Sequence, residues 1–113
     1  MELKCNGKTL ANKVKVYSSL LFKGKGLMFS RFNNFDALLF KFEKEKFITI
    51  HTFFVFFPID VVWLNKNYEV VDIKKDIKPF TLFIRPKNKA KYLIEFPAGK
   101  IVEVKESSQI VFP

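Results

Sequence analysis

The sequence predicts a mainly β fold, at the margin of α+β, with a barrel-like or strongly curled antiparallel or mixed sheet and one or two short helices. Runs rich in aromatic and β-branched residues recur along the chain, and Pro, Gly, Asn and charged clusters separate them. Residues 13–17 alternate polar and apolar side chains with the period of two that is typical of a half-buried strand. About eight short strands at such close spacing favour a barrel or a curled sheet.

The first half of the chain contains one predicted helix and one predicted hairpin. Ser18 and Ser19 can cap a short helix over residues 20–23, because a serine hydroxyl accepts a hydrogen bond from the free N–H groups of a first helical turn. The glycines that follow can end this helix. Runs 37–42 and 47–57 flank a charged segment that we expect to be a hairpin loop.

The second half predicts another hairpin and several shorter strands. Pro58 interrupts the ladder because it has no N–H to donate, and residues 59–64 and 68–73 then form two strands around an Asn-Lys-Asn turn. Short strands are also expected over 81–84, 90–96, 101–104 and 109–112.

Length and composition favour a single domain over residues 1–113. A chain of 113 residues can bury a core by itself, and its 49% hydrophobic and 27% charged residues are ordinary globular values. No internal repeat or Gly/Pro/Ser-rich linker divides the chain. The many Lys, Phe and Ile residues beside a single glutamine suit a thermophile or, alternatively, an AT-rich genome.

The expected location is cytoplasmic. Cys5 has no second cysteine with which to pair, which fits a reducing compartment, and the first residues lack the apolar stretch of a secretory signal. The apolar segment 47–64 approaches the length of a membrane-spanning helix, but His51, Pro58 and Asp60 lie inside it. Because such residues are costly in lipid, we expect no membrane span.

The charge of the chain favours anionic partners. Twenty Lys and Arg residues against eleven Asp and Glu residues give a formal charge of +9. Lysines interleaved with aromatic residues can follow a nucleic-acid backbone, although a solvated basic face has the same pattern. Two basic segments carry the excess, and the residues that we single out in them are Lys23 and Lys25 in the N-terminal third, then Arg85, Lys87, Lys89 and Lys91.

Three motifs occur in an order that resembles a known family. The chain contains Gly26-Leu27-Met28-Phe29, then Phe57-Pro58-Ile59-Asp60-Val61-Val62, then Glu95-Phe96-Pro97-Ala98-Gly99. In this order and rough spacing they resemble the domain of unknown function 192 family over residues 12–112. The resemblance implies a β-rich, barrel-like fold with little helix, and it implies no activity because the family has none assigned. The motif positions that it marks are Gly26, Met28, Pro58, Glu95 and Gly99.

The chain departs from the family pattern in three places. His51-Thr52-Phe53-Phe54-Val55 stands where many bacterial members have Trp-Met-Lys-Asn-Thr. The arginine that usually follows the first motif directly is Ser30 here, with Arg31 one place later, and Ser107-Ser108 replaces a late Gly-Asp pair. Polar sites that the family builds on these positions are therefore not carried over to this chain.

Arg31, His51 and Asp60 are the candidate binding residues. An ionised Asp60 between Ile59 and Val61 needs a partner, which can be a ligand or, alternatively, backbone N–H groups or a basic side chain. His51 is the single histidine, and it can contact an anion or be a hydrogen-bonded structural residue. Without a second His or a Cys-x-x-Cys motif, we expect no metal and no other cofactor.

These residues favour a domain that binds rather than catalyses. The first hypothesis is a ligand- or protein-binding accessory domain, monomeric or weakly associating, with a pocket near Arg31, His51 and Asp60; Asp60→Asn should then abolish binding and leave the fold intact. The second is a nucleic-acid-binding module that uses the basic surface. An enzyme is the third and least favoured hypothesis, because a lone His, scattered carboxylates and no nucleophile pair form no recognisable catalytic group. The expected partner is thus an anionic ligand, a protein or a nucleic acid.

Overall fold

The computed structural model describes residues 2–18, 36–50, 57–81, 83–99, 101 and 103–111. These residues contain no helix, and the short helix expected over 20–23 lies outside them. The mainly β class that the sequence predicts is therefore confirmed. The described strands are β1 (Leu3–Cys5), β2 (Lys8–Ala11), β3 (Val14–Ser18), β4 (Ala37–Lys46), β5 (Ile59–Leu64), β6 (Val70–Ile77), β7 (Ala90–Pro97) and β8 (Ile110–Val111).

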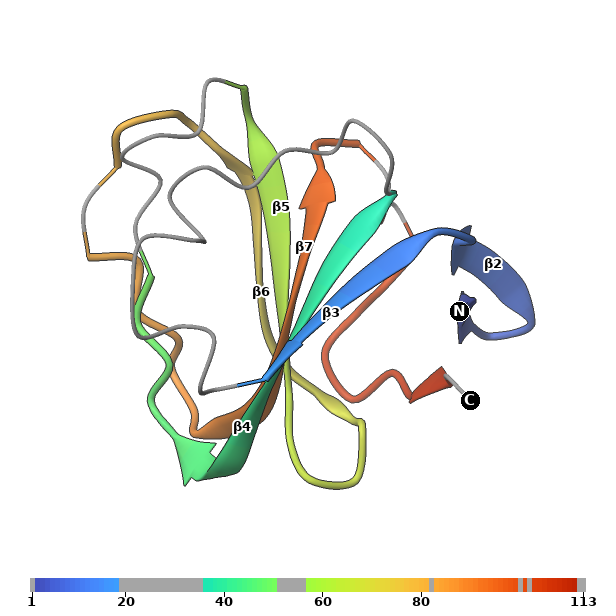
Figure 1. Cartoon of the computed structure of the whole chain (residues 1–113), viewed down its shortest axis with the longest axis horizontal. Helices are drawn as coiled ribbons and strands as arrows, with labels where there is room; N and C mark the ends of the chain where they lie inside the picture. Colours follow the sequence, from blue (N-terminus) through green and yellow to red (C-terminus); the bar gives the residue numbers. More distant parts are fainter. Residues whose placement is uncertain are drawn as a thin grey trace.

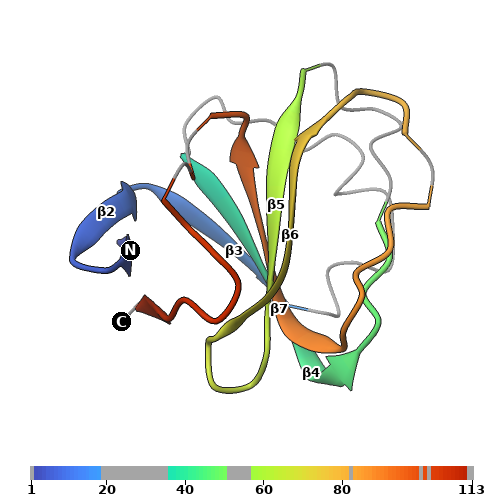
Figure 2. The same ribbon diagram turned by 180° about the vertical axis from the view of Figure 1, so that it is seen from behind.

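The described strands form two sheets (Figures 1 and 2). A five-stranded sheet has the order β3-β4-β7-β5-β6, and a three-stranded sheet has the order β2-β1-β8. β3 and β4 pair in parallel, whereas the other neighbouring strands pair antiparallel. The two ends of the chain lie side by side, since β1 pairs with β8.

The five-stranded sheet is open, so the barrel-like or strongly curled arrangement expected from the sequence is not confirmed. Its outer strands, β3 and β6, each pair with one strand among the described residues. A pattern with period two specifies which face of a strand is buried, but that pattern is the same in barrels and in open sheets. Closure depends on whether the outer strands pair with each other, which no local pattern encodes. The sheet contains both parallel and antiparallel strand pairs. It is therefore a mixed sheet, which was one of the two predicted alternatives, antiparallel or mixed.

One of the two predicted hairpins is confirmed. β5 and β6 pair antiparallel on either side of an asparagine turn, in which Asn65 Oδ1 accepts hydrogen bonds from the N–H groups of Asn67 (2.9 Å) and Glu69 (3.0 Å). The hairpin predicted around the charged segment 43–46 is wrong, because β4 continues through this segment to Lys46 and pairs with β3 and β7. Most of the side chains of 43–46 are exposed, so charge is tolerated on this end of the strand.

Two of the shorter predicted strands are also wrong. Residues 81–84 and 101–104 form no strand where the structure describes them, and Ile84 makes a single bridge to Ile50. The strands predicted near 90–96 and 109–112 are found as β7 and β8. The sequence analysis did not predict the hairpin of β1 and β2 at the start of the chain.

One face of the five-stranded sheet packs against the three-stranded sheet. Leu39, Val62 and Ile94 come from the central strands β4, β5 and β7, and they belong to one hydrophobic cluster with Leu3 of β1 and Ile110 of β8. All five side chains are buried. Apolar burial of this kind contributes most of the favourable free energy of folding, so the two sheets stabilise each other.

The opposite face packs against two segments outside the strands. Phe40 and Trp63 are fully buried there, in a second cluster with Ile48, Ile77 and Ile84. The indole N–H of Trp63 donates a hydrogen bond of 2.9 Å to the carbonyl oxygen of Ile48. This bond attaches the segment after β4 to the middle of the sheet and satisfies the polar group of a buried tryptophan. No helix in the described part of the chain has both the length and the hydropathy that a bilayer-spanning segment needs.

Candidate functional site

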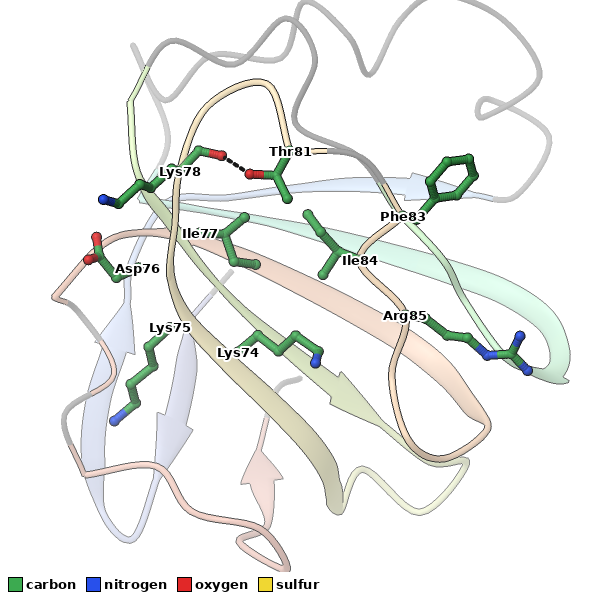
Figure 3. A pocket seen from close by; sticks show the side chains of 9 residues that line it. All are labelled: Lys74, Lys75, Asp76, Ile77, Lys78, Thr81, Phe83, Ile84 and Arg85. Atoms are coloured by element: carbon green, nitrogen blue, oxygen red, sulfur yellow. Dashed lines mark hydrogen bonds between the residues drawn. The ribbon is translucent and has the colours of Figure 1, made fainter.

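An open pocket of about 750 Å³ lies between the second half of β6 and the segment that follows it (Figure 3). Four of the side chains that line it are cations and one is a carboxylate, so we call it the basic pocket. Its volume falls in the range of about 300–1,000 Å³ that is usual for small-molecule sites. The lining residues are Lys74, Lys75, Asp76, Ile77, Lys78, Thr81, Phe83, Ile84 and Arg85.

The floor of the basic pocket is apolar and fixed. Ile77 and Ile84 are buried and point toward each other in Figure 3. The backbone of Ile84 is held by two hydrogen bonds to Ile50, with N–O distances of 2.9 and 3.0 Å. The pocket has two walls, β6 on one side and the segment with Ile84 and Arg85 on the other. At the turn between the two walls, the Thr81 hydroxyl donates a 2.7 Å hydrogen bond to the carbonyl oxygen of Lys78. The two walls therefore rest on the second hydrophobic cluster.

A β-bulge shapes the β6 wall. Ile59 of β5 pairs with Ile77 and Val61 pairs with Lys74, so β6 has one more residue than β5 between these two pairs. Asp76 lies within the bulge and has a positive φ of 53°. A bulge bends a strand and re-aims its side chains. The lysines on this half of β6 consequently depart from simple in-and-out alternation.

Asp60 supports the bulge from behind. Its Oδ1 accepts a 2.8 Å hydrogen bond from the N–H of Asp76, and its Oδ2 accepts a 2.9 Å bond from the N–H of Gly99. The Asp60 side chain is buried, with the residue 2% exposed. It borders a smaller cavity of about 390 Å³ that Lys75 and Ala98 also line. This geometry matches the structural alternative for Asp60, in which backbone N–H groups satisfy the carboxylate.

Asp72 fixes the opposite wall in the same way. Its Oδ1 accepts a hydrogen bond from its neighbour Ile73 (2.8 Å), and its Oδ2 accepts one from the N–H of Lys87 (2.9 Å). The Asn88 side-chain amide also donates to the carbonyl oxygen of Val71 (2.9 Å). The segment that carries Arg85 is thus attached to β6. Asp72 is not among the residues predicted from the sequence, although it interrupts an apolar run of β6 much as Asp60 interrupts β5.

The cations of the basic pocket are exposed to solvent. Lys74, Lys75, Lys78 and Arg85 are all exposed. Among the described residues, Lys74, Lys75 and Arg85 take part in no ion pair. The guanidinium of Arg85 instead lies over the ring of Phe47, 4.7 Å from its centroid. A cation over an aromatic face is held in position while its outer side stays in solvent.

Phe83 stands at the rim of the basic pocket beside Ile84 and Arg85 (Figure 3). It is 83% exposed, and its φ of 55° is in the left-handed region. A bulky residue in that region is a true backbone outlier and costs on the order of 1–3 kcal/mol. Phe80, on the same connection after β6, is 55% exposed with a φ of 60°.

The structure brings only part of the predicted site together. Of the second basic segment, Arg85 lines the basic pocket, whereas Lys89 and Lys91 do not. Lys87 forms an ion pair with Glu106, and this hydrogen-bonded contact raises the pKa of Lys87. The predicted residues that lie outside the described part of the chain are Lys23, Lys25, Gly26, Met28, Arg31 and His51.

Three pocket lysines were not predicted. Lys74, Lys75 and Lys78 come from the end of β6 and the turn after it. The signal for them is the sequence of residues 70–78, where two adjacent lysines break the in-and-out alternation of a strand. Such a break is typical of a bulge or of a strand end with both faces in water.

Two motif residues, Pro58 and Glu95, lie outside the lining of the basic pocket. The carbonyl oxygen of Pro58 accepts a 3.2 Å hydrogen bond from the N–H of Ala98, directly beside the turn that holds Asp60. Glu95 is half-buried on the central strand β7, paired with Leu38 on one side and Val61 on the other. Burial raises the pKa of Glu95 to about 7.

The described residues contain no group of three or more His, Cys, Asp or Glu side chains that could hold a metal ion. Cys5 is buried in the first hydrophobic cluster, where a thiol is shielded from reagents.

The sequence has relatives among thermophilic archaea. The model of the domain of unknown function 192 family, described as uncharacterized ACR, matches residues 1–112. The UPF0127 protein of Thermococcus sibiricus is 37% identical over 100 residues, which are 87% of this chain and 63% of the relative. The UPF0127 protein of Pyrococcus horikoshii is 34% identical over 87 residues, 77% of this chain and 74% of the relative. This chain therefore spans less than two thirds of the first relative.

Two solved structures share the fold. A Sinorhizobium meliloti protein described as a candidate transcription regulator has a TM-score of 0.82 at 17% identity, over 97% of this chain and 91% of its own. A Novosphingobium aromaticivorans protein of unknown function also has a TM-score of 0.82, at 15% identity, over 99% of this chain and 84% of its own. At these identities the likeness concerns the fold alone.

Proposed function

The chain belongs to the domain of unknown function 192 family, and we propose that it is a non-catalytic binding module that takes a phosphate-bearing anion in the basic pocket. The observation that carries the proposal is the composition of the pocket: four cationic side chains and a single carboxylate around an apolar floor. The net charge of +9 supports it, because a positive field draws anions toward the surface.

The arrangement of the cations supports a multivalent anion over a single carboxylate. Lys74, Lys75 and Lys78 occupy one wall, and Arg85 occupies the other. An exposed ion pair contributes only about 0–1 kcal/mol, so one negative charge would bind weakly. Several phosphates that contact both walls at once add these small contributions. Arginine also offers phosphate a planar pair of donors, and the contact with Phe47 keeps that plane in place.

Titration calorimetry with inorganic tripolyphosphate at low salt tests the proposal. The pocket variant carries three substitutions, Lys74→Gln, Lys75→Gln and Arg85→Gln. If each lost contact is worth about 0.5–1 kcal/mol, the triple variant should bind about 10- to 150-fold more weakly. The exposed position of all three side chains keeps the cost to folding small.

The matched control removes the same charge outside the pocket. Lys13, Lys66 and Lys105 are exposed lysines that do not line it, and all three are changed to Gln. This control should lose only about two- to threefold, through the lower net charge. Equal losses in the two triple variants would show that tripolyphosphate binds to the general surface charge, and the pocket proposal would then be wrong.

A further inference from the structure

The rim of the basic pocket carries an aromatic side chain that contributes little to the fold. Phe83 is 83% exposed, so almost none of its apolar surface gains from burial. Its backbone is also in the left-handed region, with a φ of 55°. Single exposed hydrophobic residues are ordinary, but a bulky one in this conformation costs free energy that smaller residues or glycine would avoid. Strained residues of this kind cluster at binding and switch sites.

The position of Phe83 links it to the pocket cations. Two residues further along, Arg85 lies over the ring of Phe47, which is itself 40% exposed. Phe83 and Arg85 therefore come from the segment on one side of the pocket, and the three lysines come from β6 and the turn after it on the other side. In Figure 3, Lys74 extends toward the segment of Arg85, whereas Lys75 and Lys78 extend away from it. An aromatic ring and several cations thus border the same pocket.

We infer, on the basis of the proposed function, that the ligand of the basic pocket is single-stranded nucleic acid, with Phe83 as a stacking platform for a base. Lys74, Lys75 and Lys78 lie where the phosphates would pass, and Arg85 contacts a phosphate or a second base. Non-specific single-strand binding combines these two elements, a positively charged groove and aromatic rings on which bases stack.

Two features favour a single strand over other anions. The pocket is open to solvent rather than enclosed, so an extended chain can lie across it without being threaded into a cavity. A base inside a duplex has both faces covered by its neighbours, so it offers no free face to Phe83. An acidic peptide would satisfy the lysines, but it would leave the exposed ring without a planar partner.

Fluorescence anisotropy with a labelled oligothymidine at low salt tests the inference. Phe83→Leu keeps an apolar side chain and removes the ring, and Phe83→Trp keeps an aromatic ring. Because base stacking on an aromatic residue is worth about 1–3 kcal/mol, Phe83→Leu should weaken binding about 5- to 150-fold, and Phe83→Trp should bind within about threefold of the unchanged protein. A duplex of the same sequence should bind more weakly than the single strand.

An abasic strand of equal length separates stacking from charge. It has the same phosphates and no bases, so Phe83→Leu should weaken its binding far less than it weakens the binding of oligothymidine. The far-ultraviolet circular dichroism of each variant shows whether the fold is retained, and Phe83→Gly, which relieves the positive φ, provides a second ring-free variant if Phe83→Leu fails to fold.

The outcomes distinguish the two proposals. If Phe83→Leu and Phe83→Gly bind oligothymidine as tightly as the unchanged protein, the stacking role is wrong. Tighter binding of the duplex, or equal binding of an oligoglutamate peptide, would also overturn the single-strand assignment. In each of these cases the loss of tripolyphosphate binding in the Lys74/Lys75/Arg85 variant would still support an anion site. If that variant binds every anion normally, the proposed function itself is wrong.

Discussion

Two buried carboxylates hold the walls of the basic pocket at the scale of single residues. Asp60 and Asp72 are 2% and 7% exposed, and each accepts hydrogen bonds from two backbone N–H groups. A buried carboxylate is stable only when its lone pairs are occupied, and here the donors are backbone N–H groups rather than cationic side chains. Neither carboxylate therefore forms an ion pair with Lys74, Lys75 or Arg85 in the part of the chain that the structure describes.

Asp60→Asn should destabilise the protein. An asparagine can accept one of the two hydrogen bonds, but its NH₂ group would face the other backbone N–H, donor against donor. We expect a loss of about 2–3 kcal/mol in the free energy of unfolding, measured by urea denaturation. Asp76→Asn is the matched control, because Asp76 is exposed and asparagine tolerates its positive φ, so its stability should stay within about 0.5 kcal/mol. A stable Asp60→Asn variant that fails to bind tripolyphosphate would instead support the ligand role that the sequence left open.

Glu95 should make stability depend on pH. Its pKa in the folded protein is raised to about 7 by burial beside Leu38 and Val61, whereas the ordinary value is 4.5. Below the ordinary value both states hold the proton and nothing is lost. Between about pH 4.5 and 7 the unfolded chain releases the proton more readily, so stability falls as pH rises, by on the order of 3 kcal/mol.

Glu95→Gln isolates this effect. The variant should match the unchanged protein in urea denaturation near pH 4.5 and exceed it by about 3 kcal/mol near pH 8, because glutamine does not ionise. A constant difference between the two proteins at all pH values would show that the Glu95 carboxyl titrates normally in the fold.

At the scale of elements, local turn chemistry was a better guide than charge. The hairpin of β5 and β6 was predicted from Asn65 and its neighbours, and the Asn65 side chain does organise that turn. The same chemistry joins β1 to β2, where Asn6 and Gly7 have positive φ values of 53° and 78°. An Asn-Gly pair between short strands is a strong hairpin signal, so this hairpin was predictable and was missed.

The error at β4 has a different physical cause. The sequence predicts a loop over the charged segment 43–46, because charged residues between two apolar runs are usual in turns. In the structure the strand runs past the edge of the core, and its outer end still gains backbone hydrogen bonds from β7, with Lys46 paired to Ala90. Main-chain pairing does not depend on side-chain polarity, so composition alone cannot mark where such a strand ends.

At the scale of the whole molecule, the basic pocket is a product of tertiary structure. Its cations come from β6 and from a segment after it, and the wall that carries Arg85 rests on Phe47 and Ile50, which follow β4. The sequence predicted that Asp60 needs a partner and that Arg85 belongs to a basic surface. It did not show that a bulge and two buried carboxylates bring Arg85 opposite Lys74, because those contacts join residues that are distant in the chain.

The salt dependence of oligonucleotide binding should measure this arrangement as a whole. If the four pocket cations each neutralise one phosphate, the logarithm of the binding constant should fall against the logarithm of salt concentration with a slope of about −3, since each contact to a single strand contributes about −0.7. Removing Lys74, Lys75 and Arg85 together should bring the slope to about −1. The lysines at 13, 66 and 105 do not line the pocket, so their replacement should keep the slope near −3. Titrations between about 50 and 200 mM salt resolve such a difference. A slope that falls equally in both triple variants would mean that the strand is bound by charge spread over the whole surface, and that the basic pocket has no special part in it.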